Sequence, residues 1–379
     1  MYFASAFALF APSRLHYLPF KHQSKYEISF VCFVIIFLLR TCLTGDGRHN
    51  EACYATQLEI LMTYFVTGAA GFVGSRLSRV LLDRGDTVVG LDNLNDYYAL
   101  EHKQRHLRDL EGAGGFTFIK GDLRDPALLR DLFARHQPDA VAHLAAMAAV
   151  RYSVEHPLIY GEVNVQGSMN LMDAARLNGR PRMVLASTGS VYGADTPVPF
   201  NEDAPAVLPL APYPASKRAM ELMAHCYHHL WKLPITVVRF FNVYGPHGRP
   251  DMMPWQWSQS ILKGEPLTLY GGGRLMRDWT YIDDIVSGLV AALDKGLDWE
   301  ILNLGCGHPV ENLRFVRLLE GLVGRGATIQ DTPTPPSEPL VTYADISKAS
   351  RLLGWKPQVQ VEQGLANFIQ WMRQEHLLG

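Results

Sequence analysis

Tyr213 and Lys217 are the residues of this chain whose types and spacing point most directly to chemistry. They lie four positions apart in the segment A-P-Y-P-A-S-K, and that spacing places two side chains on one face of a helix. A lysine cation beside a phenol stabilises the phenolate, which lowers a pKa that starts near ~10. Such a tyrosine can take a proton from a sugar hydroxyl near neutral pH. The same spacing recurs by chance in helices, so its meaning depends on its surroundings.

A glycine-rich segment, T-G-A-A-G-F-V-G, supplies part of that context. Gly68, Gly71 and Gly74 are three apart and lie between an expected strand and an expected helix. Glycine lets the backbone turn tightly and approach a pyrophosphate, whose charge then lies at the N-terminus of the helix. A glycine triplet alone is a weak signal, but its position between a strand and a helix makes it strong. The segment predicts a dinucleotide site.

Asp92 indicates which dinucleotide is bound. It ends the second expected strand, about twenty residues after the glycines, where a carboxylate accepts hydrogen bonds from the adenosine ribose and repels a 2′-phosphate. The alternative is that Asp92 only begins a turn, since Asn93 follows it. The joint pattern favours NAD over NADP. Asp122 and Leu123, at the end of the third expected strand, are placed to meet the adenine.

The elements that must position these residues follow an alternating rhythm from Met62 onward. Alternation of β-branched runs with amphipathic stretches predicts an α/β fold, a doubly wound parallel (Rossmann) sheet with right-handed crossovers. After about residue 245 the rhythm loosens, which predicts a smaller C-terminal α/β substrate domain. The expected domains are therefore 62–244 and 245–379. The expected strands are 64–67, 87–91, 116–119, 140–144, 183–186 and 235–240, and the clearest expected helices are 71–84, 126–136, 157–177 and one running from about 213 to about 231.

Composition narrows the class of protein further. Of the 379 residues, 48% are hydrophobic and 19% charged, with a formal net charge of −2, which is typical of a globular protein. A nucleic-acid surface would need a basic excess. The five cysteines include no CxxC pair, so neither a disulfide framework nor a zinc ribbon is expected, and a reducing cytoplasm fits best.

Residues 1–61 look foreign to the rest of the chain. They contain an apolar run, 28–39, between Lys25 and Arg40, and this run is shorter than the roughly 20 residues that a membrane-spanning helix needs. No clean small-residue cleavage site follows it. We interpret this leader as a misassigned start, with Met62 as the true one. The alternative is a weak membrane anchor through residues 28–39.

Beyond these single features, the chain resembles the nucleotide-sugar epimerases and dehydratases of the extended short-chain dehydrogenase/reductase family. The resemblance runs from Met62 to about Arg373. Besides T-G-A-A-G-F-V-G and Y-P-A-S-K, it is carried by H-L-A-A at 143–146, R-F-F-N-V-Y-G-P at 239–246 and R-D-W-T-Y-I-D-D-I at 277–285. Together these motifs are highly specific.

The resemblance assigns a role to each matching residue. Tyr213 would be the catalytic base, Lys217 the ribose-binding cation, and Thr188 the hydroxyl that hydrogen-bonds the reacting sugar oxygen. The implied NAD-binding residues are Gly68, Gly71, Phe72, Val73, Gly74, Asp92, Asn93, Asp122, Leu123, Leu144, Ala145, Ala146, Asn164, Tyr213, Lys217 and Phe241. The implied substrate-binding residues are Thr188, Asn242, Arg249, Arg277 and Glu338, with Asn242 and Arg277 on the uridine diphosphate.

The segment L-A-S-T-G-S-V-Y-G at 185–193 indicates which reaction is run. Dehydratases and decarboxylases that resemble this chain place acidic residues just after the catalytic Ser or Thr, and here Gly189 and Ser190 stand there. Neither side chain titrates. What remains is transient oxidation at C4 with bound NAD and reduction on the opposite face, which is 4-epimerisation of a UDP-sugar.

The substrate is indicated by three further segments. L-D-N-L-N-D-Y-Y, A-A-V-R-Y-S-V-E-H-P and G-P-H-G-R-P-D-M resemble the branch that interconverts UDP-glucuronate and UDP-galacturonate. Arg249 would meet a carboxylate or phosphate, or else form a loop ion pair. That branch usually has a serine where Gly189 stands and a threonine where Asn242 stands. Both departures remove hydroxyls, so UDP-glucose and UDP-galactose remain the alternative substrates.

The other residues that could bind a metal are better explained by structural roles. His225, His228 and His229 have metal-like spacing but no supporting cluster, and Asp283 and Asp284 read as N-terminal helix caps, so no metal site is expected. The rival functions are a dehydratase or decarboxylase, a simple NAD-dependent dehydrogenase and a non-catalytic NAD-binding or RNA-binding protein. The resemblance also implies a homodimer formed through two helices of the sheet domain.

Overall fold

The computed structural model describes residues 61–377. The expected leader lies outside them except for Leu61, and the apolar run 28–39 lies wholly outside. Across the described residues, every helix is too short or too polar to cross a membrane.

A seven-stranded sheet organises the described part, in the order β10-β6-β5-β4-β1-β2-β3. All its neighbouring strands are parallel, which confirms the predicted Rossmann-type α/β fold. Its strands are β1 (Thr63–Thr67), β2 (Thr87–Asp92), β3 (Phe116–Lys120), β4 (Ala140–His143), β5 (Arg182–Thr188), β6 (Ile235–Phe240) and β10 (Trp299–Leu304).

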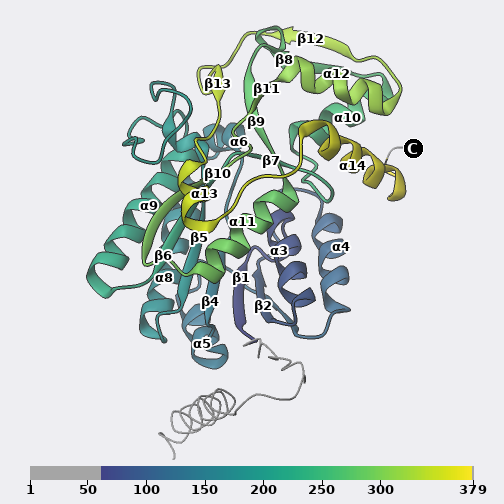
Figure 1. Ribbon diagram of the computed structural model, residues 1–379. Coiled ribbons are helices and arrows are strands. Elements are labelled where there is room, and N and C mark those ends of the chain that lie inside the picture. The colour runs from purple at the N-terminus through teal and green to yellow at the C-terminus, as the bar shows by residue number, and fades with distance from the viewer. Residues whose placement is uncertain (1–60, 378–379) are drawn as a thin grey trace, which may run out of the picture. The chain divides into compact units, whose positions relative to one another are not determined.

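Helices cover both faces of this sheet (Figure 1). Alternate strand residues face opposite cores: Tyr64 and Val66 pack with α3 and α11, whereas Phe65 packs with α5, α8 and α9. The strands are therefore buried on both sides, as parallel strands are. The flanking helices are α3 (Phe72–Asp83), α4 (Leu100–Glu111), α5 (Pro126–His136), α6 (Val150–Glu155), α7 (Pro157–Tyr160), α8 (Ser168–Leu177), α9 (Pro212–Trp231) and α11 (Ile282–Lys295), with a 3-10 turn η3 (Gly189–Tyr192).

The helix expected over 157–177 is not uniform. A π-helical stretch, η2 (Gly161–Gly167), separates α7 from α8. Wider turns of this kind are frequent at functional sites. Here the stretch carries Asn164, whose buried side chain binds the backbone of Met147 in the loop after β4.

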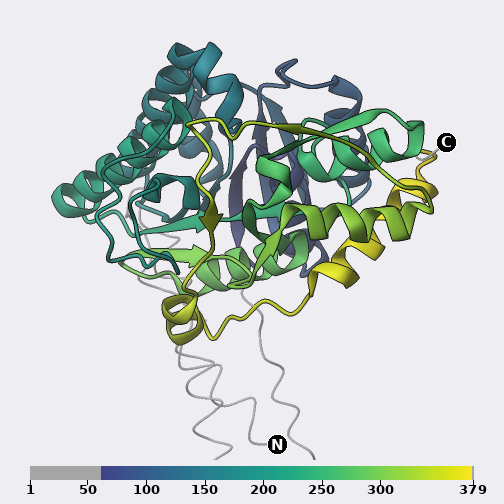
Figure 2. The ribbon, with the colours of Figure 1, turned by 90° about the horizontal axis from the view of Figure 1, so that it is seen from above.

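The C-terminal elements form two smaller sheets beyond the carboxyl edge of the large one. Figure 2 shows their green and yellow segments in front of the purple and blue strands. Strand β10 returns from this part to pair with β6, so the large sheet takes a strand from beyond residue 244. The 62–244 and 245–379 division stays a prediction. The elements here are β7 (Asn242–Tyr244), α10 (Met253–Lys263), β8 (Pro266–Tyr270), η4 (Gly271–Gly273), β9 (Met276–Tyr281), β11 (Pro309–Glu311), α12 (Asn312–Val323), β12 (Thr328–Thr332), β13 (Val341–Thr342), α13 (Ser347–Leu353) and α14 (Val361–Gln374).

The prediction that Asp283 and Asp284 cap a helix is wrong. Helix α11 begins at Ile282, and the residue at its cap position, Tyr281, makes no side-chain cap hydrogen bond. Asp284 instead accepts backbone hydrogen bonds from Gln358 and Val359, at 2.9 and 3.0 Å. It ties the C-terminal segment to α11, because each of its oxygens meets a backbone donor from that segment.

Candidate active site

A cavity of about 360 Å³ opens at the carboxyl edge of the large sheet, where ligands bind in open α/β sheets. Its lining comes from the β1–α3 turn, the ends of β2, β4 and β5, the start of α9 and the segment after β6. The structure brings together seventeen of the predicted site residues in this lining: Gly68, Gly71, Phe72, Val73, Gly74, Asp92, Asn93, Leu123, Leu144, Ala145, Ala146, Thr188, Tyr213, Lys217, Phe241, Asn242 and Arg249.

The glycine turn is a cradle that side chains would fill. Gly68 has a φ of +72°, and a Cβ there would lie 2.8 Å from the backbone nitrogen of Ala145. A Cβ at Gly74 would lie 2.1 Å from the carbonyl oxygen of Gly68. Gly71 is the N-cap of α3, so backbone N–H groups at this helix end face the cavity side of the turn. The turn therefore fits a pyrophosphate.

The H-L-A-A segment forms the loop that faces the glycine turn, and side-chain hydrogen bonds hold this loop in place. His143 is fully buried, and its ring nitrogens lie 2.8 Å from the hydroxyls of Thr67 and Ser168. The Thr67 hydroxyl in turn accepts the backbone N–H groups of Leu144 and Ala145, each at 3.1 Å. Burial lowers the pKa of His143 to about 3, so its ring is a neutral connector that fixes the loop facing Gly68.

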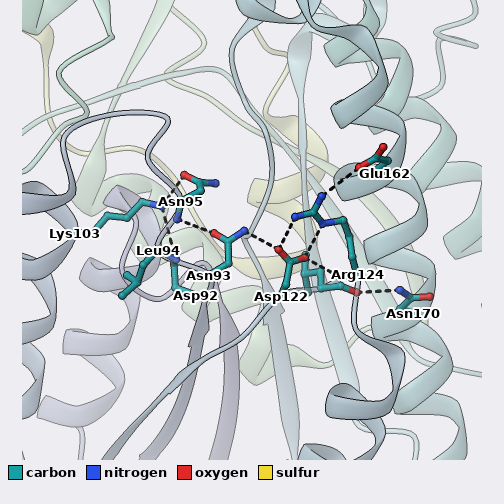
Figure 3. A network of polar contacts seen from close by, with 10 residues as sticks. Asp92, Asn93, Leu94, Asn95, Lys103, Asp122, Arg124, Glu162 and Asn170 are labelled. Carbon is teal, nitrogen blue, oxygen red and sulfur yellow. Dashed lines mark hydrogen bonds and ion pairs between the residues drawn. The ribbon is translucent and has the colours of Figure 1, made fainter.

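Two predicted NAD residues lie outside the lining. Asn164 is buried and donates to the Met147 carbonyl and to the Ser216 hydroxyl, both at 2.9 Å, so it holds a cavity loop against α9. Asp122 accepts hydrogen bonds from Asn93 at 3.0 Å and from Arg124 at 2.9 Å (Figure 3). Arg124 holds the pKa of the Asp122 carboxyl well below its usual range. NAD binding by Asn164 and Asp122 stays a prediction. The contacts given above are those that each side chain makes with other groups of the protein.

The three predicted catalytic residues converge at the other end of the cavity. Thr188 is the last residue of β5, and Tyr213 and Lys217 lie on the first turns of α9, which starts with Pro212 at its first helical position. The Thr188 hydroxyl lies close enough to the Tyr213 phenol to lower its pKa, and it accepts the Ser190 N–H at 3.2 Å. The spacing in A-P-Y-P-A-S-K therefore does place the pair on one buried helical face.

The prediction that Lys217 lowers the pKa of Tyr213 is wrong within the part of the chain that the structure describes. Burial raises the pKa of this phenol, and the nearby Thr188 hydroxyl and the charge of Arg249 offset that rise only in part. Lys217 points elsewhere: its ammonium donates to the Ala186 carbonyl at 2.8 Å. Burial lowers the pKa of Lys217 to about 8, against the opposing charge of Glu221.

Glu221 belongs to a buried network that the sequence analysis missed. It accepts from the Ser187 hydroxyl at 2.6 Å and from Arg239 at 2.9 and 2.7 Å. Ser187 precedes Thr188, and Glu221 lies four residues after Lys217 on the same helix, so the network fixes both flanks of the catalytic group. That i,i+4 spacing on a buried face is the signal that could have revealed it.

Gly189 has a steric reason to be glycine. A Cβ there would lie 2.8 Å from two atoms of the Phe241 ring, and Phe241 is itself part of the lining. The next residue, Ser190, is exposed. Gly189 is thus packed tightly against an aromatic ring, and neither Gly189 nor Ser190 brings a titratable side chain to the cavity.

Arg249 lines the cavity and already has a protein partner. It donates to both carboxylate oxygens of Asp251, at 2.9 and 2.6 Å, and Asp251 also accepts from the Tyr97 hydroxyl at 3.1 Å. The loop ion pair that the sequence allowed is therefore present. Its guanidinium still lies near enough to the Tyr213 phenol to influence that group's pKa.

Arg277 and Glu338 are brought together, outside this cavity. Arg277 donates to Glu338 at 2.8 Å, and Arg151 lies 3.7 Å from the other oxygen of Glu338. Arg151 also stacks over the Tyr270 ring at 4.8 Å. Arg151 also lines a second cavity, of about 480 Å³, together with Trp255 and Tyr270. The sequence analysis missed this cavity because its walls come from distant segments without a shared motif.

The histidines considered as metal ligands lie on α9, with His225 and His229 exposed and His228 half-buried. Within residues 61–377, the acidic, histidine and cysteine side chains form no group of three or more that could hold a metal ion.

A parallel sheet whose carboxyl edge carries one cavity, with a glycine cradle at one end of that cavity and a Thr-Tyr-Lys group at the other, defines a class of dinucleotide-dependent enzymes. The model of the NAD dependent epimerase/dehydratase family matches residues 64–305, and the chain belongs to that family. It is 42% identical to a UDP-glucuronate 4-epimerase of Thermodesulfobacterium geofontis, over 82% of this chain and 96% of that protein.

Solved structures agree with this assignment. A UDP-glucuronic acid 4-epimerase from Bacillus cereus, in complex with UDP-glucuronic acid and NAD, is 36% identical with a TM-score of 0.79, covering 83% of this chain and 100% of that one. A UDP-glucose 4-epimerase from Thermotoga maritima, with UDP-glucose, is 29% identical with a TM-score of 0.77 over 83% and 100% of the two chains. The predicted family and fold are confirmed.

Proposed function

We propose that this protein is an NAD-dependent UDP-sugar 4-epimerase that interconverts UDP-glucuronate and UDP-galacturonate. One observation carries the reaction type: Tyr213, Thr188 and Lys217 share a cavity in which the sole carboxylate contributed by residues 61–377 is Asp92, at the glycine-turn end. The catalytic end therefore offers the Tyr213 phenol beside Thr188 and Lys217, and no carboxylic acid among its lining residues to serve as a second proton donor. A dehydratase or decarboxylase needs that second group.

The cofactor site fits NAD, because a side chain at Gly68 or Gly74 would collide with the backbone of the glycine turn and of the loop that faces it. NAD, when bound, supplies the reversible oxidant for C4 and a positive charge that favours phenolate at Tyr213. Tyr213 then takes the C4 hydroxyl proton and returns it after the sugar has turned over. Thr188 holds the reacting oxygen, and Lys217 binds the ribose. These roles of the three residues are part of the proposal.

The nucleotide half of the substrate is assigned to the Arg277 region. Arg277 is buried and paired with Glu338, and a diphosphate would give its guanidinium a second anionic partner in fork geometry. The cavity beside Arg151 offers Tyr270 and Trp255 as apolar walls, which suits a nucleobase. Asn242 would contact the substrate between these regions and the catalytic residues.

Arg249 supports UDP-glucuronate as the substrate, since it is the lining cation on the sugar side and a C6 carboxylate complements it. UDP-glucose and UDP-galactose are the second candidate. What favours them is that Gly189 carries no hydroxyl and that Asn242 offers both an amide donor and an acceptor, which can serve a hydroxymethyl group.

We further propose a homodimer and a cytoplasmic location. Leu222, Met223 and Leu230 on α9 are exposed by 54%, 37% and 64%, an apolar stripe that a second copy would cover. Cys226 and Cys306, the cysteines within the described residues, are free thiols, which suits a reducing compartment. Light scattering of the purified protein, compared with Leu230→Glu, tests the dimer.

Proton NMR of the purified protein with each substrate in turn tests the function. UDP-glucuronate should yield its C4 epimer, seen as a changed H4 coupling, with a higher kcat/KM than UDP-glucose under equal conditions. No NADH should accumulate, which distinguishes an epimerase from a dehydrogenase. A 4-keto-6-deoxy sugar or a pentose product would overturn the reaction, and faster turnover of UDP-glucose would overturn the substrate.

A further inference from the structure

Lys103 is a buried cation at the adenosine end of the main cavity. It lies on α4, its side chain is only 5% exposed, and it helps to line the cavity. Its ammonium lies 2.9 Å from the Asn95 side-chain oxygen and 3.4 Å from Asp92 Oδ1 (Figure 3). The Tyr98 ring lies beneath it at 5.4 Å. A buried lysine is costly unless it is paired, so this placement calls for a function.

The two oxygens of Asp92 have different surroundings. Oδ1 accepts the Leu94 N–H at 2.8 Å as well as the Lys103 ammonium. For Oδ2, residues 61–377 provide no hydrogen-bond donor. Lys103 and Leu94 thus fix the carboxylate through one oxygen and leave the other for a ribose hydroxyl. The same contact partly cancels the negative charge that would repel a 2′-phosphate.

Other cations of this region are engaged elsewhere. Arg124 pairs with Asp122 and with Glu162, Arg249 pairs with Asp251, and Lys217 binds the Ala186 carbonyl at the catalytic end. Lys103 is therefore the cation positioned to meet a group attached to the adenosine ribose. A lysine ammonium on a flexible stem is a well-suited phosphate partner.

We propose that Lys103 is a specificity-determining residue of the dinucleotide site: Asp92 holds its ammonium as a counter-ion, which selects NAD, and without that carboxylate the same ammonium binds the 2′-phosphate of NADP. The inference rests on the proposed NAD site and adds to it. In a site without such a cation, removal of the carboxylate would weaken NAD binding and gain little for NADP.

A double-mutant cycle tests this assignment. The proteins are wild type, Asp92→Asn, Lys103→Met and Asp92→Asn/Lys103→Met, each freed of bound nucleotide and checked for folding by circular dichroism. Asn at position 92 keeps an oxygen for the Leu94 N–H, so the loop should be preserved. Kd values for NAD and NADP are measured by calorimetry, with nucleotide-induced shifts of the unfolding midpoint as a second readout. Lys103→Gln replaces Lys103→Met if the latter does not fold.

In Asp92→Asn, the preference for NAD over NADP should fall by at least ~10²-fold, since a charge repulsion becomes a charge-assisted contact. At least ~10-fold of that change should disappear in the double variant, and NADP binding by Asp92→Asn should weaken with added salt. An equal NADP gain in the double variant would overturn the inference, as would no gain in Asp92→Asn. Wild type that binds neither nucleotide would remove the proposed function itself, whereas intact NAD binding with either of the former outcomes removes only the role of Lys103.

Discussion

The dinucleotide end and the sugar end of the cavity prepare for their ligands in different ways. At the dinucleotide end, glycines leave open backbone, and the polar side chains around Asp92 are fixed by protein contacts that leave one oxygen without a donor from residues 61–377. At the sugar end, Arg249 is paired with Asp251, and outside the cavity, where the nucleotide half of the substrate is proposed to bind, Arg277 is paired with Glu338. The first end is preformed, and the second must share or exchange ion-pair partners when substrate binds.

This difference has an energetic basis. Removing one partner of a buried ion pair costs about 3–5 kcal/mol. Arg277 is buried, whereas Arg249 and Asp251 are partly exposed, so displacement by a neutral ligand is disfavoured most strongly at the Arg277–Glu338 pair. A ligand that brings its own anionic groups can replace the carboxylates, because each guanidinium then stays paired. The arrangement thus favours substrates with a diphosphate and, near Arg249, a carboxylate.

The largest expected effect lies at the catalytic group of the sugar end. Tyr213→Phe removes the phenol proposed to take the C4 hydroxyl proton and should lower kcat by at least ~10²-fold. Folding and NAD binding should persist, since the ring remains. Kinetics alongside NAD titration check this, and a variant that turns over near the normal rate would mean that another group moves the proton.

Lys217→Met should lower turnover by about 10²-fold without lowering thermal stability at pH 7. Its pKa is lowered by burial from an ordinary 10.5 to about 8, so the unfolded chain binds more protons between those values. By linkage, this group's contribution to stability rises with pH across that window and is unfavourable below it. Methionine removes the buried charge while keeping the stem.

Unfolding midpoints at pH 7 and pH 9 separate the two effects. The gap between wild type and Lys217→Met should narrow as pH rises. A marked loss of stability in Lys217→Met at pH 7 would instead make Lys217 a structural residue, held by its bond to Ala186.

The sequence predicted what local pattern determines. Buried β-branched runs located the strands, and the motif spacing placed Tyr213, Lys217 and the glycines, because each depends on neighbours close in the chain. Contacts between distant segments were not predictable in this way. Lys103 lies on a helix whose polar sequence predicts exposure to solvent, but its ammonium meets Asp92, at the end of β2, and Asn95, in the loop that follows. The partners of Asp284 lie more than seventy residues away.

Electrostatic balance was also beyond the sequence. The spacing of Tyr213 and Lys217 predicts that both lie on one face of a helix. Their pKa values depend instead on how deeply each side chain is buried and on which group the Lys217 ammonium donates to. Here burial outweighs the neighbouring charges, so the pKa of the phenol rises and that of the lysine falls.

The ion-pair exchange is tested by two variants of one pair. Arg249→Gln should lower kcat/KM for UDP-glucuronate by about 10-fold, and change that for UDP-glucose much less. Asp251→Asn frees Arg249 from its competitor, so the KM for UDP-glucuronate should fall. Steady-state kinetics on both substrates decide, and shifts in the same direction for both variants would show that the pair only supports the loop.

The smallest effect is expected at Gly189, the residue that follows Thr188. An alanine Cβ would lie 2.8 Å from the Phe241 ring, and overpacking of this size costs roughly 1–3 kcal/mol. Gly189→Ala should therefore lower the unfolding midpoint and raise the KM for UDP-sugar several-fold, because Phe241 moves toward the cavity. Ser190→Ala is the matched control for stability, since its exposed side chain meets no such ring. Adding Phe241→Leu to Gly189→Ala should restore part of the stability by making room for the methyl group. Without that rescue, the glycine at 189 would owe its presence to the substrate rather than to Phe241.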